Sequence, residues 1–178
     1  MPRPDFSSKK DKIEKFIRVN QAGEYGAKRI YEGQIRFTKN MSDKDELNIM
    51  LSQEQVHLEY FNKQLNIRKI RPTIFMPFWH LGGYTLGAVS AAFGIKTAML
   101  ITDAVEDVIE EHYNQQINYL KYSNFENDLM IQLQKFRQDE IEHKNIAAEH
   151  IGNGLTTMLV TQIVKAICKS AIAISKSL

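Results

Sequence analysis

The stretch EQVH, residues 54–57, places a carboxylate and an imidazole three residues apart, and the chain repeats this spacing in EIEH, residues 140–143. Residues three apart lie on the same face of an α-helix, so each Glu-x-x-His pair can aim both side chains at one point. A single pair of this kind is most often a solvated or salt-bridged pair on a helix surface. The repetition makes the residues around the two pairs decisive for the fold.

Each pair has one lone glutamate upstream, at a distance that fits a helical hairpin. Glu24 precedes Glu54 by 30 residues and Glu106 precedes Glu140 by 34, with one predicted helix break inside each interval. At about 1.5 Å of rise per residue, an antiparallel hairpin brings each lone glutamate level with its Glu-x-x-His. Two such hairpins give the ligand set of a ferritin-like di-iron or di-manganese bundle. The six candidate metal ligands are Glu24, Glu54, His57, Glu106, Glu140 and His143.

The charges of these six residues also favour a pair of divalent cations. Four carboxylates balance two such cations, and two neutral imidazoles add no charge. Without metal, four facing carboxylates would be very costly to bury. Mixed oxygen and nitrogen ligands suit iron or manganese, and the absence of thiolates argues against a zinc-finger-type site.

The whole chain, residues 1–178, is expected to form one domain. The four prolines lie at positions 2, 4, 72 and 77, which leaves two long spans free of this helix breaker. No sustained alternation of apolar and polar residues predicts a strand. Ser42, with acidic residues close behind it, is predicted to cap the second helix. The predicted fold is all-α, a ferritin-like four-helix bundle with a long apolar crossover helix and a C-terminal amphipathic helix; its core helices are expected over about 11–39, 43–68, 97–122 and 126–151.

Two further segments, about residues 73–95 and 155–177, are expected to face a membrane. The first is long enough to span a bilayer. It contains Pro77 and several glycines and must connect the hairpins, so an interfacial helix is preferred over a spanning one, with burial at a dimer interface as the soluble alternative. Apart from a narrow stripe of lysines, the second has only apolar, hydroxyl-bearing or amide side chains, which suits a membrane surface with the lysines at the phosphates, or packing in an oligomer. The stripe comprises Lys165, Lys169 and Lys176.

Composition excludes several classes of function. The formal net charge is +2, and no basic stripe with interleaved aromatic residues is present, which argues against nucleic acid as a partner. Cys168 is the single cysteine, so an intrachain disulfide is excluded and a reducing compartment fits. The polar N-terminus lacks the features of a secretory signal or a transit peptide, so a bacterial or already mature chain is expected.

Two glycines lie beside the first lone glutamate, inside a predicted helix. Gly23 and Gly26 flank Glu24, although glycine costs roughly 1 kcal/mol against alanine in a helix. Small residues there either leave room for a substrate or dioxygen or permit a tight helix crossing. The sequence alone leaves these two interpretations equal.

Five stretches resemble the flavin-independent demethoxyubiquinone hydroxylases, and the similarity runs from about residue 12 to the C-terminus. They are RVNQAGEYGAKRIYEGQ (18–34), EQVHLEYFN (54–62), RPTIFMPFWHLGGYTLGA (71–88), AVEDVIEEHYNQQI (104–117) and FRQDEIEHKNIA (136–147). The resemblance implies that the six candidate ligands hold two iron ions. This family usually has Glu-Glu in the acidic segment, whereas Asp107 follows Glu106 here, which leaves Glu106 as the ligand. His112 and Tyr113 match a family pair linked to electron transfer, and are candidates for a role beside the ligands.

The resemblance also implies an activity and its partners. It implies a monooxygenase that hydroxylates the ring of 2-polyprenyl-3-methyl-6-methoxy-1,4-benzoquinone in ubiquinone biosynthesis. The implied reactants are dioxygen and electrons from NADH, without flavin. The expected location is the bacterial cell membrane, peripheral and on the cytoplasmic side, or the matrix side of the mitochondrial inner membrane for a mature eukaryotic chain. A homo-oligomer or partner proteins of ubiquinone biosynthesis are further expected partners.

Three other functions share parts of this pattern. A soluble iron-oxidising protein of the ferritin or rubrerythrin type has the same ligand set but no need of two membrane-facing segments. A quinol oxidase would reduce dioxygen to water without hydroxylating a ring. A non-enzymatic helical adaptor at a membrane surface would use the Glu and His residues as salt bridges.

Overall fold

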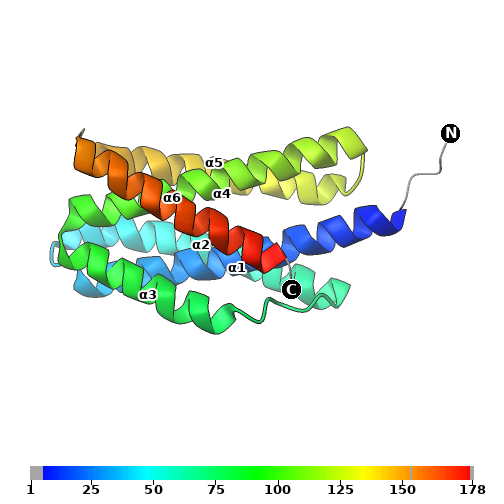
Figure 1. Cartoon of the computed structure of the whole chain (residues 1–178), viewed down its shortest axis with the longest axis horizontal. Helices are drawn as coiled ribbons and strands as arrows, with labels where there is room; N and C mark the ends of the chain where they lie inside the picture. Colours follow the sequence, from blue (N-terminus) through cyan, green and yellow to red (C-terminus); the bar gives the residue numbers. More distant parts are fainter. Residues whose placement is uncertain (1–5, 153, 177–178) are drawn as a thin grey trace.

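The computed structural model describes residues 6–152 and 154–176, and these residues form helices and short connections without a strand. The all-α prediction is therefore confirmed, with an architecture consistent with a ferritin-like helical bundle. Figure 1 shows the helices running roughly along one long axis. Their bounds are α1 (Phe6–Phe37), α2 (Met41–Arg68), α3 (Met76–Ala92), α4 (Ile95–Ser123), α5 (Asn127–His150) and α6 (Leu155–Lys176).

Two antiparallel hairpins make the bundle, as the spacing of the glutamates predicts. Helix α1 packs against α2, and α4 packs against α5. Helix α1 also contacts α4, and α2 contacts α5, which closes the four helices on one another. Helix α3 connects the hairpins and packs mainly on α1, while α6 crosses the bundle against α4 and α1 (Figure 1).

The ends of the hairpin helices follow ordinary capping chemistry, with one correction to the sequence-based prediction. Asn40, not Ser42, caps α2, because its side-chain oxygen accepts hydrogen bonds from the backbone N–H groups of Ser42 (2.8 Å) and Asp43 (3.3 Å). Ser42 is already inside the helix. Helix α4 ends at Ser123, and the capping residue Asn124 that follows it has the left-handed conformation, with φ of 47°. Helix α2 therefore begins at Met41, two residues before the expected start at about residue 43, and the hairpin is unchanged.

Two of the three apolar core clusters among the described residues lie at different heights along the bundle. One is built around Ile17, Phe61 and Phe136, and the other around Tyr31 and Met99. In each of the four bundle helices, the candidate ligands lie in the sequence between a residue of the first cluster and a residue of the second. The clusters therefore fix the four helices on both sides of the candidate site, so that each ligand side chain faces inward from a packed helix.

Helices α1 and α3 approach each other closely because three glycines lie at their crossing. A Cβ atom on Gly87 would come 1.9 Å from the backbone oxygen of Ile30, and one on Gly33 would come 2.3 Å from that of Tyr84. Gly83 is nearly as crowded, with 2.8 Å to the Gly26 oxygen. The tight helix crossing is thus made by these glycines rather than by Gly23 and Gly26.

Two lysines of α6 form ion pairs with α4. Lys165 forms an ion pair with Asp107 (2.7 Å), and Lys169 forms one with Glu111 (3.0 Å), both on α4. These ion pairs were not anticipated from the lysine stripe, and its proximity to lipid phosphates stays a prediction; the side chain of Lys176 lies outside the described residues. The outward face of α6 is apolar. By length and composition alone, Thr157–Ser175 is one helical segment that qualifies to cross a membrane.

Candidate dinuclear metal site

The structure brings all six candidate ligands together in the middle of the bundle. Helix α1 supplies one glutamate, α4 supplies another, and α2 and α5 each supply a Glu-x-x-His pair, so four helices contribute. All six side chains are buried, with at most 1% of any of them exposed to solvent. Burial of this depth is rare for ionisable groups and requires partners or a metal.

The six side chains divide into two groups that share two members. Glu24 and His57 belong to one group, Glu106 and His143 to the other, and Glu54 and Glu140 belong to both. Within each group, one ligand atom from every side chain lies within 4.8 Å of the others. We call these groups the Glu24 position and the Glu106 position. Two carboxylates common to both groups would allow a pair of metal ions to share ligands, as in the dinuclear carboxylate centres of helical bundles.

The atoms that a metal would contact are those that the protein leaves without hydrogen bonds. Both carboxylate oxygens of Glu54 and of Glu140 have no hydrogen-bond partner. The same holds for one oxygen each of Glu24 and Glu106, and for Nδ1 of both histidines; these nitrogens lie 3.2–3.5 Å from carboxylate oxygens without hydrogen-bond geometry. Buried polar atoms are normally satisfied. Their convergence here, on mixed carboxylate and imidazole donors, fits two divalent ions such as iron or manganese.

The other nitrogen of each histidine is held by a residue that the sequence reasoning missed. Nε2 of His57 hydrogen bonds to the carboxylate of Asp139, and Nε2 of His143 to the side-chain oxygen of Gln53, both at 2.9 Å. Each partner directly precedes the glutamate of the opposite Glu-x-x-His pair. These bonds orient the rings and leave Nδ1 facing the site, which is the arrangement that supports a metal-bound histidine. A polar residue before each glutamate was the available signal.

Two tyrosines orient the two lone glutamates in a reciprocal way. Tyr31 on α1 donates a hydrogen bond to Glu106 on α4 (2.7 Å), and Tyr113 on α4 donates one to Glu24 on α1. Burial, with further contributions from neighbouring carboxylates, raises the pKa of both phenols well above the usual value. Both tyrosines therefore remain protonated donors. Tyr113 lies beside the site as expected, while the matching role of Tyr31 was missed.

The same reciprocity extends above and below the site. Asn20 on α1 exchanges two hydrogen bonds with Gln116 on α4, at 2.9 and 2.7 Å. Gln34 on α1 pairs with Thr102 on α4 at 3.2 Å. Residues with equivalent places on α1 and α4 are separated by 82 positions in every case, as Asn20 is from Thr102, Glu24 from Glu106, Tyr31 from Tyr113 and Gln34 from Gln116. The site thus has an approximate two-fold arrangement, with each hairpin supplying one half.

In the absence of metal, the site balances its charges by sharing protons. Burial opposes the charged form of His57, but the nearby carboxylates of Glu140 and Glu24, 3.2 and 3.5 Å from its Nδ1, outweigh burial and raise the His57 pKa to about 12. The same kind of contact raises the pKa of His143. Burial and neighbouring carboxylates raise the pKa of Glu54 and Glu106, whereas the two imidazoles overcome burial and lower the pKa of Glu140 to about 2.

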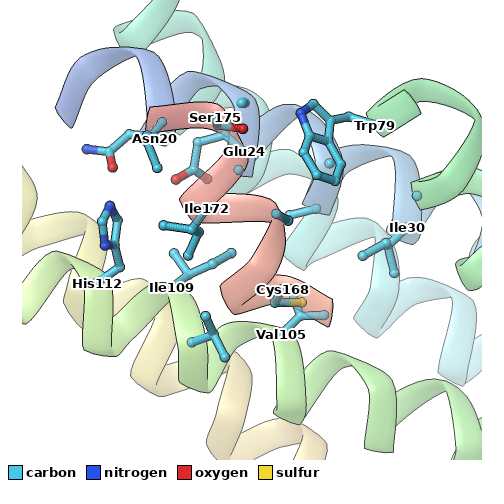
Figure 2. Close-up of a pocket in the computed structure, with 18 of the residues that line it drawn as sticks. Asn20, Glu24, Ile30, Trp79, Val105, Ile109, His112, Cys168, Ile172 and Ser175 are labelled. Carbon is cyan, nitrogen blue, oxygen red and sulfur yellow. The ribbon is translucent and has the colours of Figure 1, made fainter. Parts of the chain in front are cut away.

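A cavity of about 330 Å³ opens beside the site, between α1, α3, α4 and α6. Of the six candidate ligands, Glu24 alone lines it; Figure 2 shows Glu24 together with His112 from α4 and Cys168 from α6. Most of the remaining wall is apolar. Gly23 and Gly26 also line it, and a Cβ atom on either would meet nothing within 4 Å. These two glycines therefore leave space next to Glu24.

Comparison with known proteins identifies related chains. A family model described as "Ubiquinone biosynthesis protein COQ7" matches residues 11–175. The NADPH-dependent 3-demethoxyubiquinone 3-hydroxylases, mitochondrial, of Dictyostelium discoideum and Bos taurus are 43% and 39% identical over 80% and 95% of this chain. A 3-demethoxyubiquinol 3-hydroxylase of Rhodospirillum rubrum is 42% identical over 75% of it. The matched segments span 66%, 79% and 63% of these three relatives.

Proposed function

Because this chain belongs to the ubiquinone biosynthesis protein COQ7 family, we propose that it is a 3-demethoxyubiquinol 3-hydroxylase, an enzyme of ubiquinone biosynthesis. Relatives from three organisms bear hydroxylase names of this kind. One observation carries the proposal: a buried carboxylate and imidazole cluster, suited to two metal ions, borders an apolar cavity through Glu24. A hydroxylase needs this adjacency of a metal centre and a place for an apolar ring.

The proposed ligands are the six residues already described, and the proposed metal is iron. Bound iron would supply the redox and dioxygen chemistry that no protein side chain provides. The protein's own contribution is placement. Glu54 and Glu140 belong to both positions and would be shared by the two ions, Tyr31 and Tyr113 fix the lone glutamates, and the packed bundle excludes water from the site.

The cavity suits the ring of a polyprenyl benzoquinone that carries a methoxy and a methyl group. Its walls are mostly apolar, and its polar groups, among them Asn20, Glu24 and His112, lie near the metal site. Such a combination of apolar walls with few polar groups is typical of small-molecule sites. The polyprenyl tail would leave between α3 and α6, which both line the cavity and both expose apolar side chains.

Filling the space beside Glu24 is expected to block the substrate. In Gly26→Leu, a side chain enters the cavity without displacing backbone, so KM should rise at least about tenfold, the cost of losing 1.4 kcal/mol of binding. Gly26→Ala, the matched small variant, should keep most activity and gain about 0.5–1 kcal/mol of helix stability. Kinetics and thermal unfolding of both variants check this. Full activity in Gly26→Leu would place the substrate elsewhere.

We also propose that the enzyme binds a membrane surface through α3 and α6. Phe78 and Leu81 on α3 are 69% and 70% exposed, and Met158 and Ile163 on α6 are 62% and 60% exposed. A concentration of large exposed apolar side chains on two neighbouring faces marks a site of membrane or protein contact. An interfacial position, with α6 lying along the bundle, keeps the ion pairs from Lys165 and Lys169 intact.

A charge on the proposed membrane face should weaken vesicle binding. Ile163→Asp removes an apolar anchor, and burial of such a side chain is worth about 1.5–3 kcal/mol, so the partition coefficient should fall at least about tenfold. Ile49→Asp is the matched control, because Ile49 is 61% exposed on α2, away from that face. Flotation with anionic phospholipid vesicles measures both. Equal losses in the two variants would show that α6 has no special role.

The activity itself is tested with the substrate quinone, labelled dioxygen and a reduced nicotinamide cofactor. NADH is the electron donor implied by the family resemblance, and four-fifths of this chain aligns with a relative named NADPH-dependent, so both cofactors belong in the assay. We expect a product that carries one labelled oxygen atom on its ring. Label found in water alone would favour a quinol oxidase, and iron oxidation without any quinone reaction would favour a ferritin-like protein.

Location and assembly follow from the same proposal. A substrate with a polyprenyl tail resides in the bilayer, so a peripheral membrane position brings the cavity to it. Two of the relatives are named mitochondrial and the third is from a bacterium. The side of the membrane, a homo-oligomer and partner proteins stay predictions from the resemblance.

A further inference from the structure

The two metal positions have matching ligands but unlike partners behind their histidines. Nε2–H of His57, in the Glu24 position, donates to the carboxylate of Asp139, whereas Nε2–H of His143, in the Glu106 position, donates to the neutral amide oxygen of Gln53. Asp139 and Gln53 occupy equivalent places, each directly before the glutamate of a Glu-x-x-His pair. The approximate two-fold arrangement is therefore broken at this point by one negative charge.

The partners of the lone glutamates do not offset this difference. Each lone glutamate receives a tyrosine hydroxyl, from Tyr113 at Glu24 and from Tyr31 at Glu106. The bridging carboxylates of Glu54 and Glu140 are common to both positions. With these contributions alike, the carboxylate of Asp139 is the main difference between the two donor sets.

The cavity also distinguishes the two metal positions, because it borders only the Glu24 position. Glu24 lines the cavity, while Glu106 and His143 do not. The Glu24 position, which has the additional carboxylate, is thus also the one that borders the proposed substrate.

We propose that the two positions bind metal unequally, and that the Glu24 position fills first and more tightly because Asp139 supports His57. This inference rests on the proposed dinuclear centre. A carboxylate partner raises the basicity of a ligating imidazole, and such outer partners are typically worth about 10–100-fold in metal affinity. An amide partner orients the ring without adding charge. Asp139 and Gln53 are positioning residues, and their difference places the more tightly held metal next to the substrate.

The test is a titration of the metal-free full chain with Mn²⁺, in which calorimetry and electron paramagnetic resonance measure the binding. We expect two binding steps whose dissociation constants differ by about 10–100-fold. Asp139→Asn should weaken the tighter step by a similar factor, and Gln53→Glu should strengthen the weaker step. Both substitutions nearly preserve side-chain shape, so opposite effects on affinity report charge rather than damage to the fold. Anomalous diffraction at one equivalent of Mn²⁺ should locate the ion at the Glu24 position.

Three results would overturn the inequality: equal affinities in the unaltered chain, an unchanged tighter step in Asp139→Asn, or a first ion at the Glu106 position. Failure to bind any Mn²⁺ or Fe²⁺ would be a different result. It would contradict the proposed metal centre itself, whereas the three results above leave that centre in place.

Discussion

Replacing His57 with alanine is expected to reduce bound iron to one ion per chain or fewer and to lower hydroxylation by more than about a hundredfold. The loss of an outer hydrogen-bond partner alone typically costs 10–100-fold in affinity or activity, and His57 is a proposed direct ligand. His143→Ala should have the same effect at the Glu106 position. Both rings are buried within helices, and alanine favours helix. Elemental analysis, quinone assays and circular dichroism should therefore show lost metal and activity with helicity largely kept.

A matched control separates a ligand from an ordinary histidine. His150 also pairs with a carboxylate, that of Glu46 at 2.9 Å, but lies at the end of α5 away from the cluster. His150→Ala should keep its iron and its activity. The ligand assignment fails if His57→Ala and His143→Ala retain the iron content of the control.

Metal should stabilise the protein more strongly as the pH rises from 6 to 8. In the metal-free site the pKa of His57 is raised to about 12, so this ring carries a proton at neutral pH that must leave before metal binds. Each proton released makes the metal dissociation constant fall about tenfold per pH unit. With metal in excess, the increase in the free energy of unfolding that metal causes therefore grows by about 1.4 kcal/mol for each released proton and each pH unit.

The metal-free chain should change in the opposite direction. The stabilisation from the raised pKa of His57 is complete below the ordinary value of 6.5 and is lost as pH rises toward 12. The pKa values of Glu54 and Glu106 are raised above 4.5, so these two residues lower the free energy of unfolding as the pH rises above that value. The lowered pKa of Glu140, about 2, matters only below 4.5. The metal-free chain is thus less stable at pH 8 than at pH 6.

Thermal unfolding at pH 6, 7 and 8, with and without Mn²⁺, measures both trends. The double variant Glu54→Gln/Glu140→Gln lacks the bridging carboxylates, so Mn²⁺ should not shift its unfolding temperature at any of these pH values. A metal-induced shift that shrinks with rising pH in the unaltered chain would contradict the proton balance described above.

The fold class and the convergence of the six side chains could be predicted because both depend on local periodicity. A three-residue spacing fixes the face of a helix, and the distance from each lone glutamate to its pair fixes the hairpin. The family resemblance added Tyr113 to this set. No information from distant helices was needed for these features.

The features that sequence reasoning missed are those that depend on a partner from another helix. Asp139 and Gln53 each precede a ligand, but their contacts are to the histidine of the opposite hairpin. The ion pair from Lys165 was not anticipated, because a helical wheel shows a stripe of lysines without showing Asp107 on α4. The sequence could not decide whether Gly23 and Gly26 leave space or permit a tight helix crossing. The structure decides this, since the close crossing of α1 and α3 lies at other glycines.

The most direct test of the account is the number and position of metal ions in the purified full chain after loading with Fe²⁺ without oxygen. Elemental analysis with anomalous diffraction should find two iron ions per chain, both contacting Glu54 and Glu140, with Nδ1 of His57 on one and Nδ1 of His143 on the other. Iron absent from this cluster, or bound there through neither histidine, would contradict the central claim that six side chains from four helices hold a dinuclear centre.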